Sequence, residues 1–248
     1  MSDYKNTVYK HTYNKRKGRT FDLFRDHLTE INYDRKIWMA RDPRDIAVSE
    51  MLYRWHKGPR KRKKQSRAHL KLVQKKEQDP GSIPFHVLFS YIGQDSRPMT
   101  TDELVEMERV RYQQMSDFAE SLTSDWFIFK YEDMIEKNYD GLNKYLGFEI
   151  KDDAEIPTTT KKSKVVRKKA YGDWRHWYTE EDVDLFKSAY LPYMKAIGYD
   201  CDDWALSANP VIEPEFSSMY MTGLVQKYNR YTISSIKDFF LKPFVKPR

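Results

Sequence analysis

The stretch Lys36-Ile-Trp-Met-Ala40, followed by Arg41-Asp-Pro-Arg-Asp-Ile-Ala-Val-Ser49, decides the fold class. Its first five residues form an apolar run bounded by charges, which is typical of a buried parallel strand. Asp42 can cap a helix, Pro43 suits the first helical position, and Asp45 would lie in the positively polarised first turn. A strand that passes directly into a capped helix predicts an α/β protein.

Strands and helices are expected to alternate along the rest of the chain. The hydrophobic pattern predicts a short strand at 7–13, helices over 20–31, 100–122, 134–146 and 179–197, and a second buried strand at 126–129. This order indicates a three-layer fold in which helices flank a central parallel sheet. We expect residues 1–220 to form one domain. Residues 221–248 form a basic amphipathic tail, which could pack on the body as a terminal helix or contact an anionic membrane surface.

The net charge of +7 is concentrated in one segment. Lys57–Lys76 contains ten Lys and Arg residues and no acid, and we expect it to be a loop and an exposed helix. A local basic segment favours a specific acidic partner, such as an anionic glycan acceptor, over general polycation behaviour. Cys201 is the only cysteine, so an intrachain disulfide is excluded. The chain shows no signal peptide and no membrane-spanning run, which predicts a cytoplasmic protein.

Arg41 and Ser49 are candidates for a phosphate clamp. The strand delivers Arg41 to the carboxyl edge of the sheet, where ligands of open α/β sheets bind. A guanidinium grips two phosphate oxygens, and a hydroxyl two helical turns away can add a donor. The alternative is a capped helix with a surface arginine and a packed serine.

Two further segments can contribute to an anion site. Arg167-Lys-Lys-Ala-Tyr-Gly-Asp-Trp174 places three cations before a glycine turn, with Trp174 as an anchor in the core. Tyr131 follows the second strand and could contact a nucleotide base. The alternatives are a solvated basic loop and a core tyrosine with a polar tip.

These three segments, in this order, resemble the cytosolic-type sulfotransferase family. The resemblance implies a P-loop-NTPase-like sulfotransferase fold and transfer of a sulfuryl group from 3′-phosphoadenosine 5′-phosphosulfate (PAPS) to an acceptor hydroxyl or amine, without a metal. It implies that Tyr131 contacts the adenine. It implies that the 3′-phosphate is held by Arg41, Ser49, Arg167 and Lys168, with Lys169 beside them at a position where the family usually has glycine.

The chain departs from the family at two places. The family's Pro-Lys-Ser-Gly-Thr-Thr-Trp loop for the 5′-phosphosulfate is not recognisable, and its nearest approximation is the segment 15–21. The family's Lys-Thr-His appears here as Lys10-His11-Thr12. The resemblance makes His11 the catalytic base and Lys10 a charge-stabilising residue, whereas a surface histidine is the alternative. Residues 175–179 resemble the family's dimer motif, so a homodimer is an open expectation.

Three other functions remain open from the sequence. Without a phosphosulfate loop, the chain could bind adenosine bisphosphate and not transfer sulfate. A basic RNA-binding protein is another alternative, although the basic residues lack interleaved aromatics, so no specific nucleic acid is expected. A P-loop kinase is disfavoured because G-x-x-x-x-G-K-[ST] is absent from the sequence.

Overall fold

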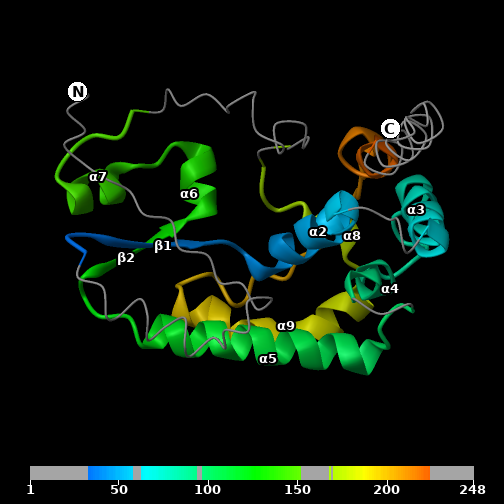
Figure 1. Cartoon of the computed structure of the whole chain (residues 1–248), viewed down its shortest axis with the longest axis horizontal. Helices are drawn as coiled ribbons and strands as arrows, with labels where there is room; N and C mark the ends of the chain where they lie inside the picture. Colours follow the sequence, from blue (N-terminus) through cyan, green and yellow to red (C-terminus); the bar gives the residue numbers. More distant parts are fainter. Residues whose placement is uncertain (1–32, 58–62, 94–96, 152–167, 169, 224–248) are drawn as a thin grey trace, which may run out of the picture.

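A pair of parallel strands lies at the centre of one half of the molecule (Figure 1). The strands are β1 (Lys36–Ala40) and β2 (Trp126–Lys130), as the two apolar runs predict. The computed structural model describes residues 33–57, 63–93, 97–151, 168 and 170–223. The expected strand at 7–13 and the expected helix at 20–31 lie outside these residues.

The register of the two strands places two candidate site residues side by side. Ala40 lies opposite Lys130 at the carboxyl ends of the strands. Arg41 and Tyr131 come next in the chain, so both leave the sheet at the same edge. Parallel pairing therefore brings together two residues from motifs that are far apart in the sequence.

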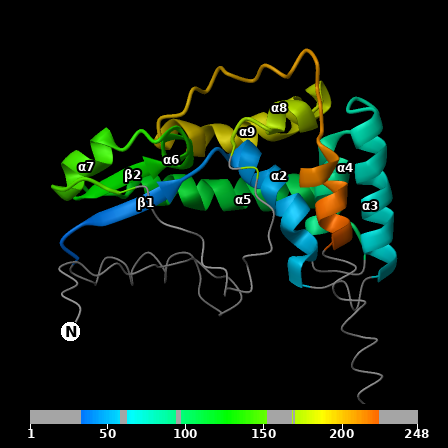
Figure 2. The ribbon, with the colours of Figure 1, turned by 90° about the horizontal axis from the view of Figure 1, so that it is seen from above.

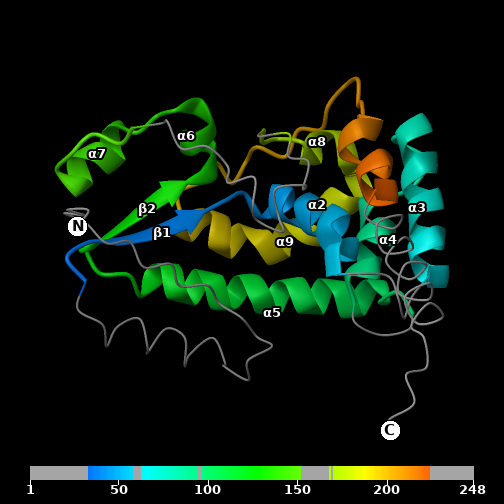
Figure 3. The same cartoon turned by 45° about the horizontal axis from the view of Figure 1, so that its top comes forward.

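Helices cover both faces of this small sheet (Figure 3). On one face, the Trp38 ring lies 4.9 Å from Phe118 of α5 (Thr101–Glu120) and 6.0 Å from Tyr193 of α9 (Glu180–Ala196), measured between centroids. On the other face, the Phe127 ring stacks on Tyr145 of α7 (Asp140–Leu146) at 5.2 Å. The α/β class expected from the sequence is confirmed, and the described residues form a two-stranded parallel sheet flanked by helices.

The predicted helix starts are confirmed by their capping hydrogen bonds. Asp42 accepts a hydrogen bond from the Arg44 amide at 2.8 Å, and Pro43 is the first residue of α2 (Pro43–Tyr53). Thr100 forms a capping box with Glu103 at the start of α5. The Asp182 carboxylate likewise accepts from the Thr179 amide at 2.8 Å at the start of α9. These signals are local, which is why sequence alone locates them.

The basic segment Lys57–Lys76 differs from the expected loop and exposed helix. Most of it belongs to α3 (Lys63–Gln78), and one face of this helix is buried. Lys76 is fully buried, and its Nζ donates to the backbone oxygens of Pro80, at 2.7 Å, and Ile83. The two carbonyls satisfy the ammonium group, while burial lowers the pKa of Lys76 to about 8. This residue is therefore a structural support and is not available to an acidic partner.

The expected helix at 134–146 is two helices instead, α6 (Tyr131–Glu136) and α7. Lys137 ends α6 in the left-handed region, with a φ of 60°, and the Asn138 amide donates to the Asp133 oxygen at 2.8 Å. The structure also contains α4 (Phe85–Phe89) and α8 (Trp174–Trp177), which the sequence analysis missed. Both are too short to show a helical period.

After α9 the chain crosses the molecule as an extended segment (residues 200–217, orange in Figure 2), here called the C-terminal strap. It includes one short 3₁₀ turn, Pro214–Phe216, and residues 218–223 are helical. Glu77 of α3 fixes the junction by accepting from the Ser218 amide at 2.7 Å and from the Ser218 hydroxyl at 2.8 Å. The expected tail boundary at 220/221 falls within this helix, and residues 224–248 lie outside the described part.

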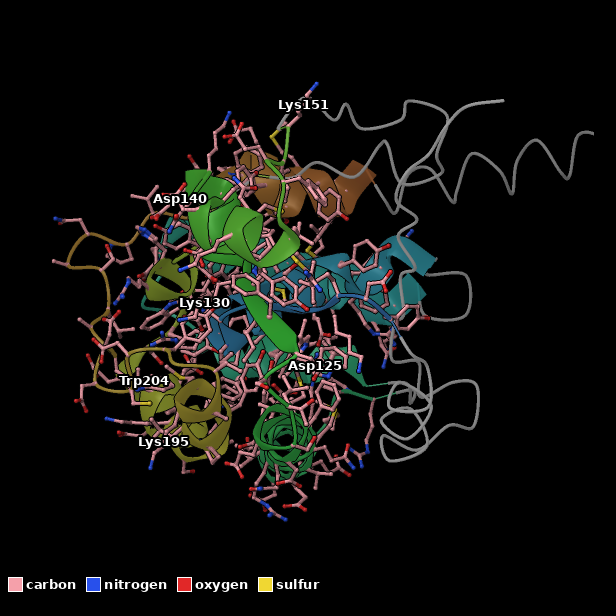
Figure 4. All side chains as sticks on the ribbon, turned by 90° about the vertical axis from the view of Figure 1, so that its left-hand side faces the viewer. Asp125, Lys130, Asp140, Lys151, Lys195 and Trp204 are labelled. Atoms are coloured by element: carbon pink, nitrogen blue, oxygen red, sulfur yellow. The ribbon has the colours of Figure 1, made fainter. Side chains whose placement is uncertain are left out.

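The other end of the strap is fixed beside β2. Lys130 Nζ donates to the Gly198 oxygen at 2.6 Å and lies over the Tyr199 ring (Lys130 is labelled in Figure 4). Among the described residues, no helix is both long and apolar enough to cross a lipid bilayer.

Candidate functional site

A cavity of about 280 Å³ lies where the sheet edge, α2, α8 and the C-terminal strap meet. Small-molecule sites typically measure about 300–1,000 Å³, so this cavity can hold part of a nucleotide. Its wall is partly apolar, with Val48, Leu52, Trp177, Ile212 and Phe216. The polar and charged lining comprises Arg41, Asp45, Ser49, Tyr53, Tyr131, Lys168, Asp173, His176, Glu213, Ser217 and Tyr220.

Four of the predicted nucleotide-binding residues line this one cavity: Arg41, Ser49, Tyr131 and Lys168. They come from all three motifs, which are widely separated in the sequence. Ser49 lies on the cavity side of α2 and is exposed. The other predicted site residues, Lys10, His11, Arg167 and Lys169, lie outside the described residues.

Arg41 carries a hydrogen-bond donor that its surroundings leave unused. Its guanidinium lies over the Tyr131 ring, 4.3 Å from the centroid. Its Nε is buried and has no hydrogen-bond partner within the described part of the chain. Buried donors without a partner are rare, so this one indicates a place for an acceptor from outside the described residues. Because Arg41 covers one face of Tyr131, a base could use only the other face or the hydroxyl.

Asp45 of α2 holds the loop that precedes Trp174 against this helix, a role that the sequence analysis did not assign to it. The carboxylate is buried and accepts from the Gly172 amide at 2.6 Å and the Trp174 amide at 3.2 Å. Gly172 has a φ of 79°, a conformation that favours glycine. Burial, together with the charge of Asp42, raises the pKa of Asp45 to about 6, although the two amides and Arg41 oppose the shift.

Arg44 supports the same junction from the protein interior. It forms an ion pair with Asp42, with an Nη2–Oδ2 distance of 2.6 Å, and is only 3% exposed. Its guanidinium lies between the rings of Trp174 and Trp204, at 4.0 and 4.7 Å from their centroids. Trp174 is itself buried, as its predicted anchoring role requires. The cation–π contacts hold the start of α2, the loop and the strap together.

No family model matches the chain, and searches among curated proteins and among solved structures find no similar protein. The function therefore has to be inferred from the residues of the cavity.

Lys168 is already paired within the protein. Its Nζ lies 2.9 Å from an Asp173 oxygen and 2.8 Å from a Glu213 oxygen. Partial burial would lower the pKa of Lys168, but the bonds to Glu213 and Asp173 outweigh it and raise the pKa. The sequence predicted that Lys168 lies in a loop that binds an anion, and the structure shows that its ammonium group already pairs with two carboxylates of the protein.

His176 is a cavity residue that sequence reasoning missed. Its Nδ1 accepts a hydrogen bond from the Val211 amide of the strap at 3.0 Å. An amide can only donate, so Nδ1 must carry the lone pair, and the neutral ring carries its hydrogen on Nε2. In this tautomer Nε2 of His176 is a hydrogen-bond donor and cannot take up a proton. Its position two residues after Gly172-Asp-Trp174 is the only sequence signal that could have indicated it.

The cavity offers charged and neutral donors to an anion. The guanidinium of Arg41, the hydroxyl of Ser49, the ammonium of Lys168 and the Nε2–H of His176 are all suited to phosphate oxygens. The described residues contain no group of three His, Cys, Asp or Glu side chains placed to hold a metal ion.

Proposed function

We propose that this chain is a sulfotransferase, which moves a sulfuryl group from PAPS to a hydroxyl or amine of an acceptor. The proposal includes the three-layer, P-loop-NTPase-like fold of that family. One observation carries it: Arg41 and Ser49 of one motif and Lys168 of another line the same cavity. The unused Nε of Arg41 supports the assignment, because the 3′-phosphate of a nucleotide would supply the acceptor.

The proposed contacts follow from the chemistry of each group. The planar guanidinium of Arg41 can hold two phosphate oxygens, and the hydroxyl of Ser49 can donate to a third. Lys168 contributes a compact charge, and Arg167 and Lys169 are its neighbours in sequence. Tyr131 begins α6 at the same sheet edge and would place the adenine there.

The proposed reaction is an in-line displacement at sulfur. The acceptor atom forms a bond to sulfur, the bond from sulfur to the phosphate oxygen breaks, and 3′,5′-adenosine bisphosphate leaves. Positioning and charge stabilisation supply most of the rate enhancement. By the family resemblance, His11 would remove the acceptor proton, a step that typically contributes ~10²–10⁴-fold, and Lys10 would stabilise the leaving oxygen.

Thermal unfolding with two nucleotides tests the proposal. 3′,5′-Adenosine bisphosphate at about one hundred times its Kd should stabilise the chain by about 2.7 kcal/mol, a rise in Tm of about 5–10 °C. AMP, which lacks the 3′-phosphate, should have a much smaller effect. Equal shifts with both nucleotides would contradict a 3′-phosphate site. Transfer of labelled sulfate to a panel of acceptors then separates an enzyme from a protein that only binds the nucleotide.

Substitution of two arginines, one in the cavity and one outside it, tests the role of Arg41 in nucleotide binding. Arg41→Ala should weaken binding of adenosine bisphosphate by about 10- to 100-fold, because a hydrogen bond to a charged group contributes about 1.5–3 kcal/mol. Arg109→Ala should leave the affinity unchanged, since Arg109 is exposed on α5 and pairs with Glu106. Calorimetric titration of both variants checks the expectation, which fails if they bind alike.

A further inference from the structure

Lys168 is held from two directions. Asp173 follows it in the same loop, whereas Glu213 belongs to the C-terminal strap. All three side chains line the cavity. An anion that is to contact Lys168 therefore meets a cation whose nearest positions are already occupied by carboxylates.

The pairing of Lys168 with two carboxylates matters because the cavity lining contains few other positive charges. Besides Lys168, its lining contains one cation, Arg41, and a third carboxylate, Asp45. Asp45 accepts two backbone hydrogen bonds and lies at the start of α2, so it is fixed in place. The carboxylates thus outnumber the cations in the lining, and an incoming anion has to replace a carboxylate in order to bind.

Glu213 is the carboxylate that can leave more easily. Its side chain is 44% exposed, compared with 30% for Asp173. Asp173 directly precedes Trp174, whose ring is buried, so its backbone is anchored. Exposed ion pairs contribute little to stability, and a solvated Glu213 therefore loses little when it turns away from Lys168.

We propose that Glu213 is a specificity-determining residue that competes with the ligand's phosphate for Lys168. The proposal rests on the proposed function for the identity of the nucleotide. A phosphodiester or another monoanion would replace the single negative charge of Glu213 beside Lys168 by an equal charge, so the electrostatic gain on binding is small. A phosphomonoester carries a charge of about −1.5 to −2 at neutral pH, so it can replace Glu213 and still interact with Arg41. The strap thus selects phosphomonoesters over phosphodiesters.

Calorimetric titration of two carboxylate variants tests the competition. Glu213→Gln should bind 3′,5′-adenosine bisphosphate and inorganic phosphate about three- to tenfold more tightly than the wild type, because both the competitor and its repulsion are removed. Its preference for phosphate over dimethyl phosphate should become smaller. Glu215→Gln removes the same charge two positions away, outside the cavity lining, and should bind like the wild type. A gain of affinity cannot result from misfolding.

The outcomes separate this proposal from the proposed function. A Glu213→Gln variant that binds no more tightly than Glu215→Gln overturns the competition, as does a gain that persists in a Lys168→Ala background. Tighter phosphate binding by Glu213→Gln, without preference for adenosine bisphosphate over AMP, supports the competition and contradicts the nucleotide site. If the chain prefers adenosine bisphosphate to AMP but Glu213→Gln does not bind more tightly, the result contradicts the competition and leaves the proposed function standing. If no variant binds either anion, both proposals fail.

Discussion

Arg41 and Arg44 are three positions apart in one motif and have opposite environments. Arg44 is buried, pairs with Asp42 and lies between two tryptophan rings. Arg41 faces the cavity, and its buried Nε has no partner among the described residues. A hydrogen-bond donor that is already paired within the protein is not available to a ligand. Arg44 therefore supports the structure around the cavity, whereas Arg41 keeps a donor without a partner among the described residues, as the proposed binding role requires.

The largest expected effect is on stability. Arg44→Met should lower the free energy of unfolding by about 3–5 kcal/mol, because it leaves the Asp42 carboxylate buried without its cation. This corresponds to a fall in Tm of about 6–20 °C. Arg41→Met should cost less than about 1 kcal/mol, since it loses mainly the contact with Tyr131. Thermal unfolding of the two variants side by side is the measurement. Equal losses of stability would show that Arg44 supports the fold no more than Arg41 does.

The next largest effect is a pH dependence of stability that comes from Asp45, which joins α2 to the loop before Trp174. Burial raises the pKa of Asp45 from 3.8 to about 6, so the folded chain binds this proton more tightly than the unfolded chain. The free energy of unfolding should therefore fall by about 2 kcal/mol between pH 4 and pH 6 on account of Asp45, by a few tenths more between pH 6 and pH 7, and stay level above about pH 7.

Asp45→Asn cannot titrate at this position. The free energy of unfolding of the wild type minus that of the variant should decrease across the same pH interval. Denaturant titrations at pH 4, 5, 6 and 7 give this difference directly. A difference that is constant with pH would show that Asp45 does not titrate in this interval.

The smallest expected effect concerns His176, whose two ring nitrogens have different roles. His176 uses Nδ1 to accept from the Val211 amide and lines the cavity, so we expect its Nε2–H to donate to an occupant of the cavity. His176→Asn keeps an acceptor near the Val211 amide but has no distal donor. We expect an unchanged Tm and an affinity for adenosine bisphosphate that is about fivefold lower, the value of one neutral hydrogen bond. His176→Gln, which restores a distal donor, should recover the affinity. A loss of Tm without a loss of affinity would make His176 purely structural.

Sequence patterns predicted the parts of the fold that depend on neighbouring residues. The strands, the cap at Asp42 and the capping box at Thr100 each require only a few adjacent positions. Arg41 and Ser49 were predicted in the same way as a phosphate clamp, and both residues line the cavity. Local signals therefore located two residues of the cavity lining, and their role in binding a phosphate stays a prediction.

The strap side could not be predicted because its contacts join distant segments. Residues 200–217 have no helical or strand period, so nothing in the sequence indicated that Glu213 would pair with Lys168. The burial of Lys76 depends on two carbonyls in the turn after α3. The break at Lys137 depends on a single left-handed residue that is not glycine. Each of these features is decided by tertiary contacts or by an unusual backbone angle, and neither leaves a sequence pattern.

The placement of Arg44 between Trp174 and Trp204 also determines when the cavity can form during synthesis. Residues 42–45 leave the ribosome well before the two rings that enclose Arg44, which lie at positions 174 and 204. Contacts of such long sequence separation close late in folding, after the loop entropy has been overcome. A nascent chain that stops before Trp204 would expose the Asp42–Arg44 pair to water, so the cavity should form only after Trp204 has been synthesised.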